Sequence, residues 1–308
     1  MSTTSSTGMS ALMQTYYDKL FISTAKNWLV HEEGAQSRPL PSGEGKIVYF
    51  QKYTPLTIIT AQITEGSNPS AVNLSATNVS GTVSEFGSYS TISKLLKLTA
   101  IDPKMKGAVE VMAQNAGESR DQMVREKALV GGTSQIAAGK ALTAVATTDT
   151  LSSSEIRKAV RTLKVNKAMR YSDGYFLGKI APHASYDLMG DSTWVNAHSY
   201  KDGENLYKGE LGRLHGVRFL ETTNWKETAN GGSSSADIIH TFVHGKEAIG
   251  VTDLNGDSQK VYVKTPGANS TDNPVDRFST VGWAMSFVPV QLVSDWIIEI
   301  KTGATDQS

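Results

Sequence analysis

The first part of the chain combines a helical pattern with a run of strand-forming residues. Apolar residues recur on one helical face over residues 9–30, and the prolines and glycines of "EEGAQSRPLPSGEG" then end the pattern. β-Branched and aromatic residues dominate residues 46–63, which predicts strand structure. We interpret residues 9–30 as part of an N-terminal arm followed by an extended connector. An ordinary first helix is the alternative.

The segment "AQITEGSNPSAVNLSATNVSGTVSEFGSYS", residues 61–90, offers little to a hydrophobic core. Gly66, Asn68 and Pro69 are turn-forming residues, and the apolar positions after them alternate with polar ones, as in a strand. Residues 46–97 are therefore predicted to form a long two-stranded ribbon. Such a ribbon is marginally stable alone and exposes unpaired backbone groups, so we expect it to lie on another chain.

A long helix is predicted after the ribbon. Asp-Pro at 102–103 is a helix start, apolar residues then recur at helical spacing, and two glycines at 131–132 end the pattern. A helix over 103–129 would be about 40 Å long. Gly107 and Gly117 lie inside it, each at a cost of about 1 kcal/mol relative to Ala.

From residue 152 the pattern becomes α/β, with two helical segments among several apolar strands. The stretch "EAIGVTDLNGDSQKVYVKT" predicts a hairpin around Asn255-Gly256, and "GWAMSFVPVQLVSDWIIEIKT" predicts two strands. No segment of 20 to 50 residues repeats, so the chain is not a solenoid.

Composition narrows the function classes. The chain has 308 residues with 30 basic and 30 acidic side chains, and this zero net charge argues against a dedicated nucleic-acid binder. Near-zero charge also favours association between copies. The absence of cysteine excludes disulfides, thiolate metal sites and cysteine nucleophiles. With no signal peptide and no apolar run long enough to span a bilayer, we expect no membrane partner.

Two patterns resemble metal sites and fail on inspection. His240 and His244 in "HTFVH" have the spacing of a zinc pair on a helix, but the segment is β-branched and has no third ligand nearby. The stretch "DLNGDSQKVYVK" begins like a calcium loop, yet it has Ser258 where the loop needs glycine and Lys264 where it needs glutamate. We predict no metal and no cofactor.

Two patterns resemble catalytic sites. The stretch "SQIAAGKA" is similar to the end of a phosphate loop, but Ser134 replaces the first glycine and Ala141 replaces the magnesium-binding hydroxyl. His183 and Asp187 have helical spacing and could form an acid–base couple, although no nucleophile is specified beside them. A cap or a packing contact explains this pair better than catalysis does, so we do not predict an enzyme.

Several stretches, in their order along the chain, resemble the major capsid proteins of tailed bacteriophages, in particular a podovirus-type family. They are "YYDKLFISTAKNWLV…SRPLPSGEGKIVYFQKYTPL", "ITEGSNPS", "VSEFGSYSTIS", "AIDPKMKGAVEVMAQNAGESRDQMV", "IAPHASYDL", "GELGRLHGVRFLET" and "VGWAMSF". The resemblance covers most of the chain, while residues 1–8 and 132–150 match poorly.

The resemblance implies an α+β fold that herpesvirus capsid floors and encapsulins share. It implies an N-terminal arm, an extended β-hairpin loop, a peripheral domain with a long spine helix, and an axial domain that meets its copies at the five- and six-fold axes. The expected segments are the arm at 1–45, the extended loop at 46–97, the peripheral domain with the spine helix at 98–150, the axial domain at 151–258, and the return to the peripheral domain at 259–308.

The function that the resemblance implies is self-assembly into the icosahedral head shell around double-stranded DNA. Expected partners are copies of the chain in hexamers and pentamers, non-specifically bound DNA, and portal, scaffold or decoration proteins. Assembly would occur in the cytoplasm of the host bacterium. The extended loop is expected to carry the contacts between subunits, through Thr64, Glu65, Gly66, Asn68, Pro69, Val72, Leu74, Glu85 and Phe86.

Some families with this fold lock the shell through a Lys–Asn isopeptide bond in the loop. Here Lys46 and Lys52 lie at the base of the ribbon and its distal half has no lysine, so we expect no such bond. Three alternatives remain open: an encapsulin-type shell around protein cargo, a phage fibre or adhesin subunit, and a hydrolase around His183 and Asp187. The absence of repeats argues against a fibre.

Overall fold

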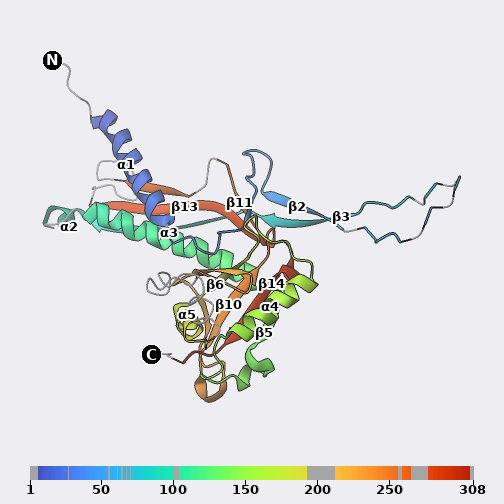
Figure 1. Ribbon diagram of the computed structural model, residues 1–308. Coiled ribbons are helices and arrows are strands. Elements are labelled where there is room, and N and C mark those ends of the chain that lie inside the picture. The colour runs from blue at the N-terminus through green and yellow to red at the C-terminus, as the bar shows by residue number, and fades with distance from the viewer. Residues whose placement is uncertain are drawn as a thin grey trace.

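The computed structural model of the chain has an elongated body from which a narrow ribbon projects (Figure 1). The structure describes residues 6–26, 28–54, 56–60, 62–63, 65–66, 68–69, 71–99, 104–192, 212–255, 259–264 and 277–305. Two sheets and their helices form the body, and a separate two-stranded sheet forms the base of the ribbon.

A five-stranded sheet is built around one long strand, β13. Its strands are β1 (Gln36–Ser37), β4 (Ser84–Ser93), β11 (Ile249–Asp253), β12 (Lys260–Lys264) and β13 (Phe278–Gln291). β4 pairs antiparallel along one edge of β13, while β12 and β11 pair antiparallel along the other edge, one after the other. Phe287 of β13 lies opposite both Ser84 and Asp253, which places β4 and β11 on different edges.

The predicted hairpin around Asn255-Gly256 is therefore wrong. β11 and β12 both pair with β13 and not with each other. The reason is that β13, with 14 residues, is long enough to accept both strands along one edge. Residues 256–258, the expected turn, lie outside the described residues.

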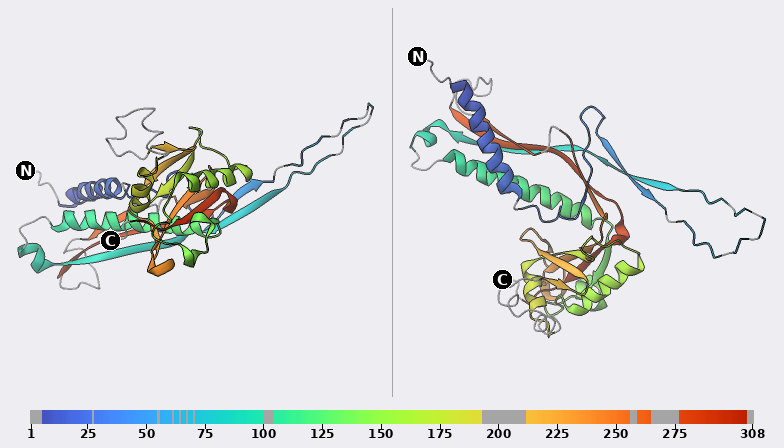
Figure 2. Two further views of the ribbon diagram at one scale, coloured as in Figure 1. Left: turned by 60° about the horizontal axis from the view of Figure 1, so that its bottom comes forward. Right: turned by 45° about the horizontal axis from the view of Figure 1, so that its top comes forward.

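Two helices cover the five-stranded sheet (Figure 2). They are α1 (Ser6–Lys26) and α3 (Lys104–Leu129), and a short helix, α2 (Lys94–Thr99), follows β4. The long helix predicted over 103–129 is thus confirmed as α3. Phe21 of α1, Val109 and Val124 of α3, and Trp283 and Phe287 of β13 are buried in one hydrophobic cluster.

The second sheet has seven strands and lies beside α4 and α5. The strands are β5 (Thr133–Ile136), β6 (Phe176–Ile180), β7 (Arg213–Leu214), β8 (Val217–Glu221), β9 (Lys226–Thr228), β10 (Ile238–His244) and β14 (Ile297–Thr302). The helices are α4 (Ser153–Val165) and α5 (Pro182–Met189), with short 3₁₀ turns at Ala137–Gly139, Leu142–Ala144, Ser233–Ser235 and Ser294–Trp296. Leu163 of α4, Leu188 of α5 and Val243 of β10 share its core.

Two strands lie in a different sheet from the one that the expected segments imply, so the chain crosses between the sheets more often than we expected. β11 follows β10 directly but belongs to the five-stranded sheet, although we expected it in the axial segment 151–258. β14 follows β13 but pairs with β10 in the seven-stranded sheet, although we expected it in the return segment 259–308. Apolar periodicity predicts that these residues form strands, but it does not say which sheet each strand joins.

The ribbon is shorter than the predicted range of 46–97. β2 (Ile47–Tyr53) pairs antiparallel with β3 (Ala76–Thr82), and the described residues between the two strands form a distal loop. The remainder of the predicted ribbon is β4 and the start of α2. β4 joins β13 because Phe86 and Ile92 pack into the core below α3. We use "ribbon" below for residues 46–83 and "distal loop" for residues 54–75.

Gly117 lowers the helix propensity of α3, but it allows a close packing contact. A Cβ atom at this position would lie 2.6 Å from the backbone oxygen of Ala25 in α1 and 3.1 Å from the Cβ of Trp28. The missing side chain therefore lets α1 approach α3 closely. Gly107 faces open space, and nothing in the structure explains why it is glycine.

The two glycines should respond differently to alanine. Gly117→Ala should lower the free energy of unfolding by about 1–3 kcal/mol, because α1 or α3 must shift to admit the methyl group. Gly107→Ala, the matched control, should raise it by up to about 1 kcal/mol through helix propensity alone. Urea unfolding of the unassembled chain, followed by circular dichroism, measures both. Equal effects at the two positions would contradict the packing role of Gly117.

Candidate assembly surfaces

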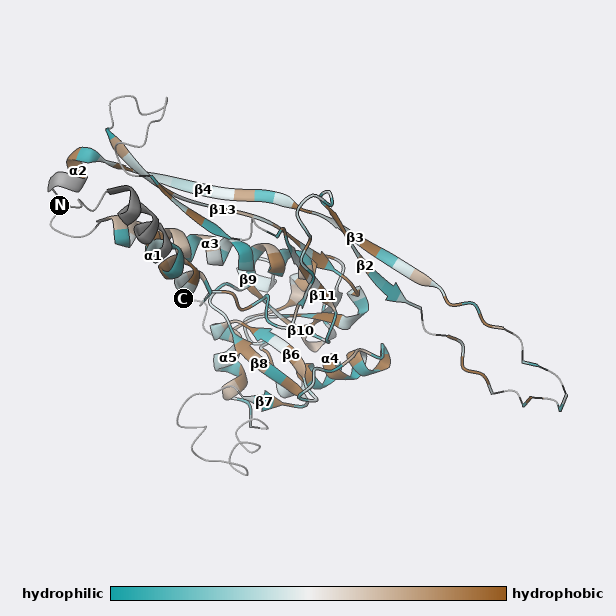
Figure 3. Ribbon diagram, turned by 90° about the horizontal axis from the view of Figure 1, so that it is seen from above, coloured by the Kyte–Doolittle hydropathy of each residue, from teal (hydrophilic) through white to brown (hydrophobic). Residues whose placement is uncertain are grey.

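The distal loop exposes aliphatic side chains that belong to none of the hydrophobic clusters formed by the described residues of the subunit. Leu56, Ile58, Ile59, Ile63, Val72 and Leu74 are between 48% and 79% exposed. Figure 3 shows hydrophobic residues recurring along both limbs of the loop. Burying one such side chain stabilises a contact by about 1.5–3 kcal/mol, so the loop carries substantial unused binding free energy.

Most of the sequence-predicted assembly residues lie on this loop. Glu65, Gly66, Asn68, Pro69, Val72 and Leu74 are all exposed there. Gly66 has a φ of +81°, the left-handed conformation that a turn at the tip requires. Thr64 lies outside the described residues.

The two other predicted residues, Glu85 and Phe86, lie on β4 and not on the ribbon. Glu85 is exposed opposite Ser286. Phe86 is half-buried, and its ring meets that of Phe287 edge-on with 5.8 Å between centroids. The structure therefore gives Phe86 a packing partner within its own chain, which the alternating pattern of residues 84–90 could not reveal.

The base of the ribbon is seated tightly on the body. Val48 and Phe50 of β2 are buried against Val290 of β13. A Cβ atom on Gly250 would lie 2.9 Å from the ring of Phe50, and one on Gly81 would lie 2.5 Å from a methyl group of Val290. Two missing side chains thus allow the ribbon to rest directly on the sheet.

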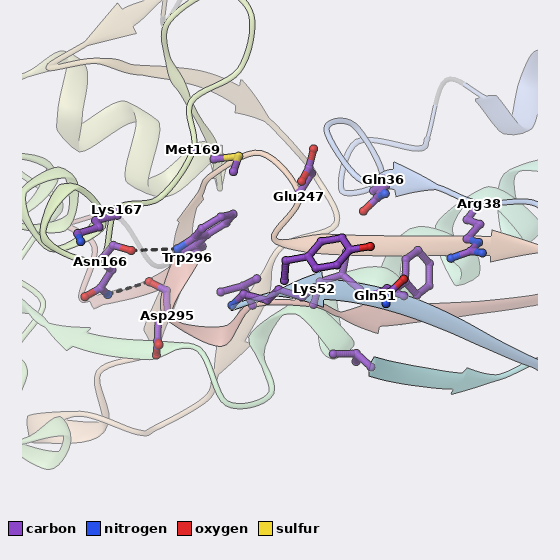
Figure 4. Close-up of a pocket in the computed structure, with 15 residues that line it drawn as sticks. Gln36, Arg38, Gln51, Lys52, Asn166, Lys167, Met169, Glu247, Asp295 and Trp296 are labelled. Atoms are coloured by element: carbon purple, nitrogen blue, oxygen red, sulfur yellow. Dashed lines mark hydrogen bonds between the residues drawn. The ribbon is translucent and has the colours of Figure 1, made fainter. Parts of the chain in front are cut away.

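A cavity of about 600 Å³ lies between the ribbon base and the loops that follow α4, β10 and β13 (Figure 4). The ammonium group of Lys52 sits 5.5 Å from the ring centroid of Trp296, in a cation–π contact. Trp296 Nε1 donates a hydrogen bond to the backbone oxygen of Asn166 (3.1 Å), and Asn166 Nδ2 donates to that of Asp295 (2.9 Å). Lys52 therefore touches a tryptophan whose position is fixed by the loop after α4.

A second hollow, of about 610 Å³, runs between α3 and the sheet. Its apolar lining comes from Phe86, Met123, Val130, Val288 and Pro289. We call it the α3 groove. Glu126 at its rim is paired with Arg125 and Lys226, whereas Lys127 beside it is exposed.

A buried polar cluster fixes residues 28–35, the connector after α1. The backbone N–H of His31 donates to Asp121 Oδ1 and its Nδ1 meets Oδ2, both at 2.6 Å. Arg120 pairs with Glu32 and Asp253 (2.8 and 2.7 Å), which holds its pKa above the ordinary value. One turn of α3 therefore holds the connector and β11 together.

The seven-stranded sheet reaches the same connector through Lys179 and His244. Lys179 is almost fully buried, and its Nζ donates to the backbone oxygen of Val30. Burial lowers the pKa of Lys179 to about 7. His244 is fully buried beside Tyr171, and burial lowers its pKa to about 3, so its ring is neutral at pH 7.

The histidines and carboxylates that could suggest catalysis have structural partners. The ring of His183 meets Trp225 edge-on at 5.4 Å, while Asp187 accepts hydrogen bonds from the backbone N–H and the hydroxyl of Thr305. His240 lies between Glu299 (2.7 Å) and the hydroxyl of Thr228 (2.8 Å).

No group of three or more metal-ligating side chains occurs among the residues that the structure describes. In the same residues, no helix is long and apolar enough to cross a bilayer.

The sequence model of a family described as phage capsid protein matches residues 86–267, more than half of the chain. The chain belongs to the phage capsid protein family. The match favours a phage head shell over the encapsulin, fibre and hydrolase alternatives. The capsid protein is thus a structural component of the virion that assembles with other copies into a shell.

Solved structures agree on the fold at low sequence identity. The capsid of Ralstonia phage GP4 superposes with a TM-score of 0.69 at 13% identity, covering 89% of this chain and 88% of that chain. The capsids of cyanophages P-SCSP1u and Pam1 both give 0.67, at 15% and 16% identity, and cover 89% and 91% of this chain and 88% and 93% of theirs. Among curated protein sequences, none matches the capsid protein.

Acid should destabilise the capsid protein through His244. Between pH 6.5 and about 3, this residue binds a proton in the unfolded chain but not in the folded one. The free energy of unfolding should therefore fall as the pH drops through this range, by on the order of a few kcal/mol from this residue.

His244→Gln should flatten that pH dependence, while the matched control His183→Gln should retain it. Urea unfolding of the unassembled chain at a series of pH values measures the slope. Carboxylates contribute equally to both variants, so the comparison isolates His244. A slope in His244→Gln equal to that of the unaltered chain would contradict the assignment.

Proposed function

We propose that the capsid protein builds its shell through the ribbon, whose distal loop lies across a neighbouring copy. The observation that carries this proposal is the row of exposed aliphatic residues on a loop that projects away from its own body (Figure 1). A shell protein assembles beside identical copies, so the surface that covers these residues belongs to another subunit. Thr64, Glu65, Gly66, Asn68, Pro69, Val72 and Leu74 make the contact.

The α3 groove is the receiving surface on the neighbour. Its apolar lining suits the aliphatic residues of the loop, and its rim offers the exposed Lys127 to Glu65 of the loop. Glu65 is the loop's one charged residue, so a single complementary contact satisfies its charge. Phe86 then acts on the receiving side of the interface and not on the loop.

The two sheets of the body correspond to the two domains expected of a capsid protein. The five-stranded sheet with α3 forms the peripheral domain, and the seven-stranded sheet with α4 and α5 forms the axial domain, which meets its copies around the five- and six-fold axes. Contacts of this head-to-tail kind close into pentamers and hexamers. The fold shared with the phage capsids supports this assignment.

The shell encloses double-stranded DNA and is assembled in the cytoplasm of the host bacterium. A chain of zero net charge suits sparse, non-specific DNA contact better than a continuous basic lining. Portal, scaffold and decoration proteins are further partners of a shell of this kind.

Polar substitution of the loop should separate folding from assembly. The triple variant Ile58→Ser, Ile59→Ser, Leu74→Ser should unfold at the same urea concentration as the unaltered chain, because these side chains are mostly exposed and lie outside the hydrophobic clusters of the described residues. Its yield of shells, measured by sedimentation and electron microscopy, should fall at least about tenfold. The control variant Thr57→Ser, Asn73→Ser should assemble normally. Normal shells from the triple variant would refute the proposal.

The groove can be tested with two valines of α3 and its C-terminal turn. Val130 lines the groove and Val111 does not, yet they are 63% and 64% exposed. Val130→Asp should reduce shell yield by about tenfold or more, since it places a charge in an apolar contact. Val111→Asp should leave the yield within about twofold. Equal yields would show that the loop docks elsewhere.

A further inference from the structure

The strand β4 has one edge that no described residue covers. Its register with β13 runs without a bulge from Ser84 opposite Phe287 to Ser93 opposite Phe278. Nine-tenths of the strand is at least partly exposed, with Tyr89 74% exposed. Figure 3 shows β4 at the outer margin of the five-stranded sheet, continuing the line of β3.

The hydrogen bonds of β13 determine which backbone groups of β4 point outward. The oxygen of Ser286 accepts from Leu254 (3.1 Å) and the N–H of Leu292 donates to Ala248 (2.9 Å), so even-numbered residues of β13 face β11. Its odd-numbered residues, Phe287 among them, therefore face β4. Since Phe287 lies opposite Ser84, the even-numbered residues of β4 face β13.

The odd-numbered residues of β4 consequently point their N–H and C=O groups away from the sheet. They are Glu85, Gly87, Tyr89, Thr91 and Ser93. Within the described part of the chain, these backbone groups of Glu85, Gly87, Tyr89 and Thr91 have no hydrogen-bond partner. Ser93 instead caps the start of α2, where its hydroxyl accepts from the N–H of Leu96 (3.1 Å). On the preceding strand the same edge is occupied, because the N–H of Val83 donates to the oxygen of Lys46 at the start of β2 (2.8 Å).

The chain leaves this edge unprotected. Soluble proteins block long edge strands with lysine, proline, bulges or a covering segment, because a bare edge recruits other strands. β4 has ten residues, no lysine, no proline and one charge, on Glu85. β12, by contrast, has only five residues and carries exposed lysines, Lys260 and Lys264, at both ends. An open β4 edge in an assembling protein is a place for another strand.

We propose that β4 accepts a strand from a second copy of the chain, namely the limb Leu56–Thr60 of its distal loop. This proposal rests on the proposed function, in which that loop lies on the neighbour. The limb is extended and β-branched, and among the described residues the pairing between the two sides of the ribbon ends at the bond from Thr54 to Ser75. Among the described residues, the outer edge of β4 and this limb thus each carry a row of unpaired backbone groups. In a shell, the limb of one copy can pair with the β4 edge of the next.

The position of Phe86 joins this edge to the α3 groove. Phe86 is a β4 residue and also lines the groove, so a strand laid along Glu85–Tyr89 runs beside it. Alternate side chains of a strand point to opposite faces. The incoming limb can therefore pair its backbone with β4 while every second side chain enters the groove. Backbone pairing sets the register, and the aliphatic side chains supply the burial.

Proline at an outward-facing position tests the pairing. Tyr89→Pro removes an outward N–H and leaves the bonds to β13 intact, so the unassembled chain should keep its urea midpoint. Its shell yield should fall at least about tenfold relative to Tyr89→Ala, which loses the same side chain but keeps the N–H. Ser90→Pro, which removes an N–H that faces β13, should instead lower the urea midpoint.

Residue-resolved amide hydrogen exchange gives a test that needs no variant. The amides of Glu85, Gly87 and Tyr89 should exchange fast in the free subunit and at least about a hundredfold more slowly in shells. The amides of Ser88 and Ser90 should be protected in both states. Fast exchange of the odd-numbered amides in shells would overturn the proposal.

The outcomes separate this proposal from the function on which it rests. If the triple serine variant of the loop fails to assemble while Tyr89→Pro assembles as well as Tyr89→Ala, the loop docks through side chains alone and the strand pairing is refuted. If the triple serine variant assembles normally, the loop is not the assembly element and both proposals fail. If Tyr89→Pro lowers the urea midpoint as Ser90→Pro does, the direction assigned to the edge is wrong.

Discussion

The whole subunit depends on one strand that is paired along both edges. β13 spans about 48 Å at the usual rise per residue, and it accepts β4 on one side and β12 and β11 on the other. α3 packs across it, the ribbon base rests on its final residues, and its chain continues into β14, which lies between β5 and β10 in the second sheet. A break in β13 would therefore separate the arm, the ribbon and the second sheet at once.

Buried polar contacts hold the connector after α1 to α3 and to the second sheet. Asp121 and Arg120, adjacent on α3, hold His31 and Glu32 of the connector, and Lys179 reaches the connector from the other sheet. Loss of one partner from any of these contacts would lower the stability of the fold, because an unpaired buried charge is strongly destabilising. The connector thus joins the two sheets only when it is in its correct place.

Sequence reasoning succeeded where the signal is local. The stripe of apolar residues over 103–129 predicted α3, and the turn residues around Gly66 predicted an exposed loop. The predictions were wrong or missing where the structure depends on pairing between residues far apart in the sequence. No period in the sequence shows that β11 and β14 exchange sheets, that Phe86 packs on Phe287, or that Gly117 admits α1. The open edge of β4 was equally invisible, since it depends on which strand lies beside it.

The tight seat of the ribbon has a consequence for the accuracy of the shell. From Tyr53 to Glu65 an extended chain covers about 40 Å, so a tilt of about 5° at the seat would move the tip by about 3.5 Å, one residue along a strand. The contacts of Phe50 with Gly250 and of Gly81 with Val290 leave no space for such a tilt. A side chain added at either glycine would act as a wedge. It would change the angle between neighbouring subunits, and with it the curvature and diameter of the particle, without touching the tip itself.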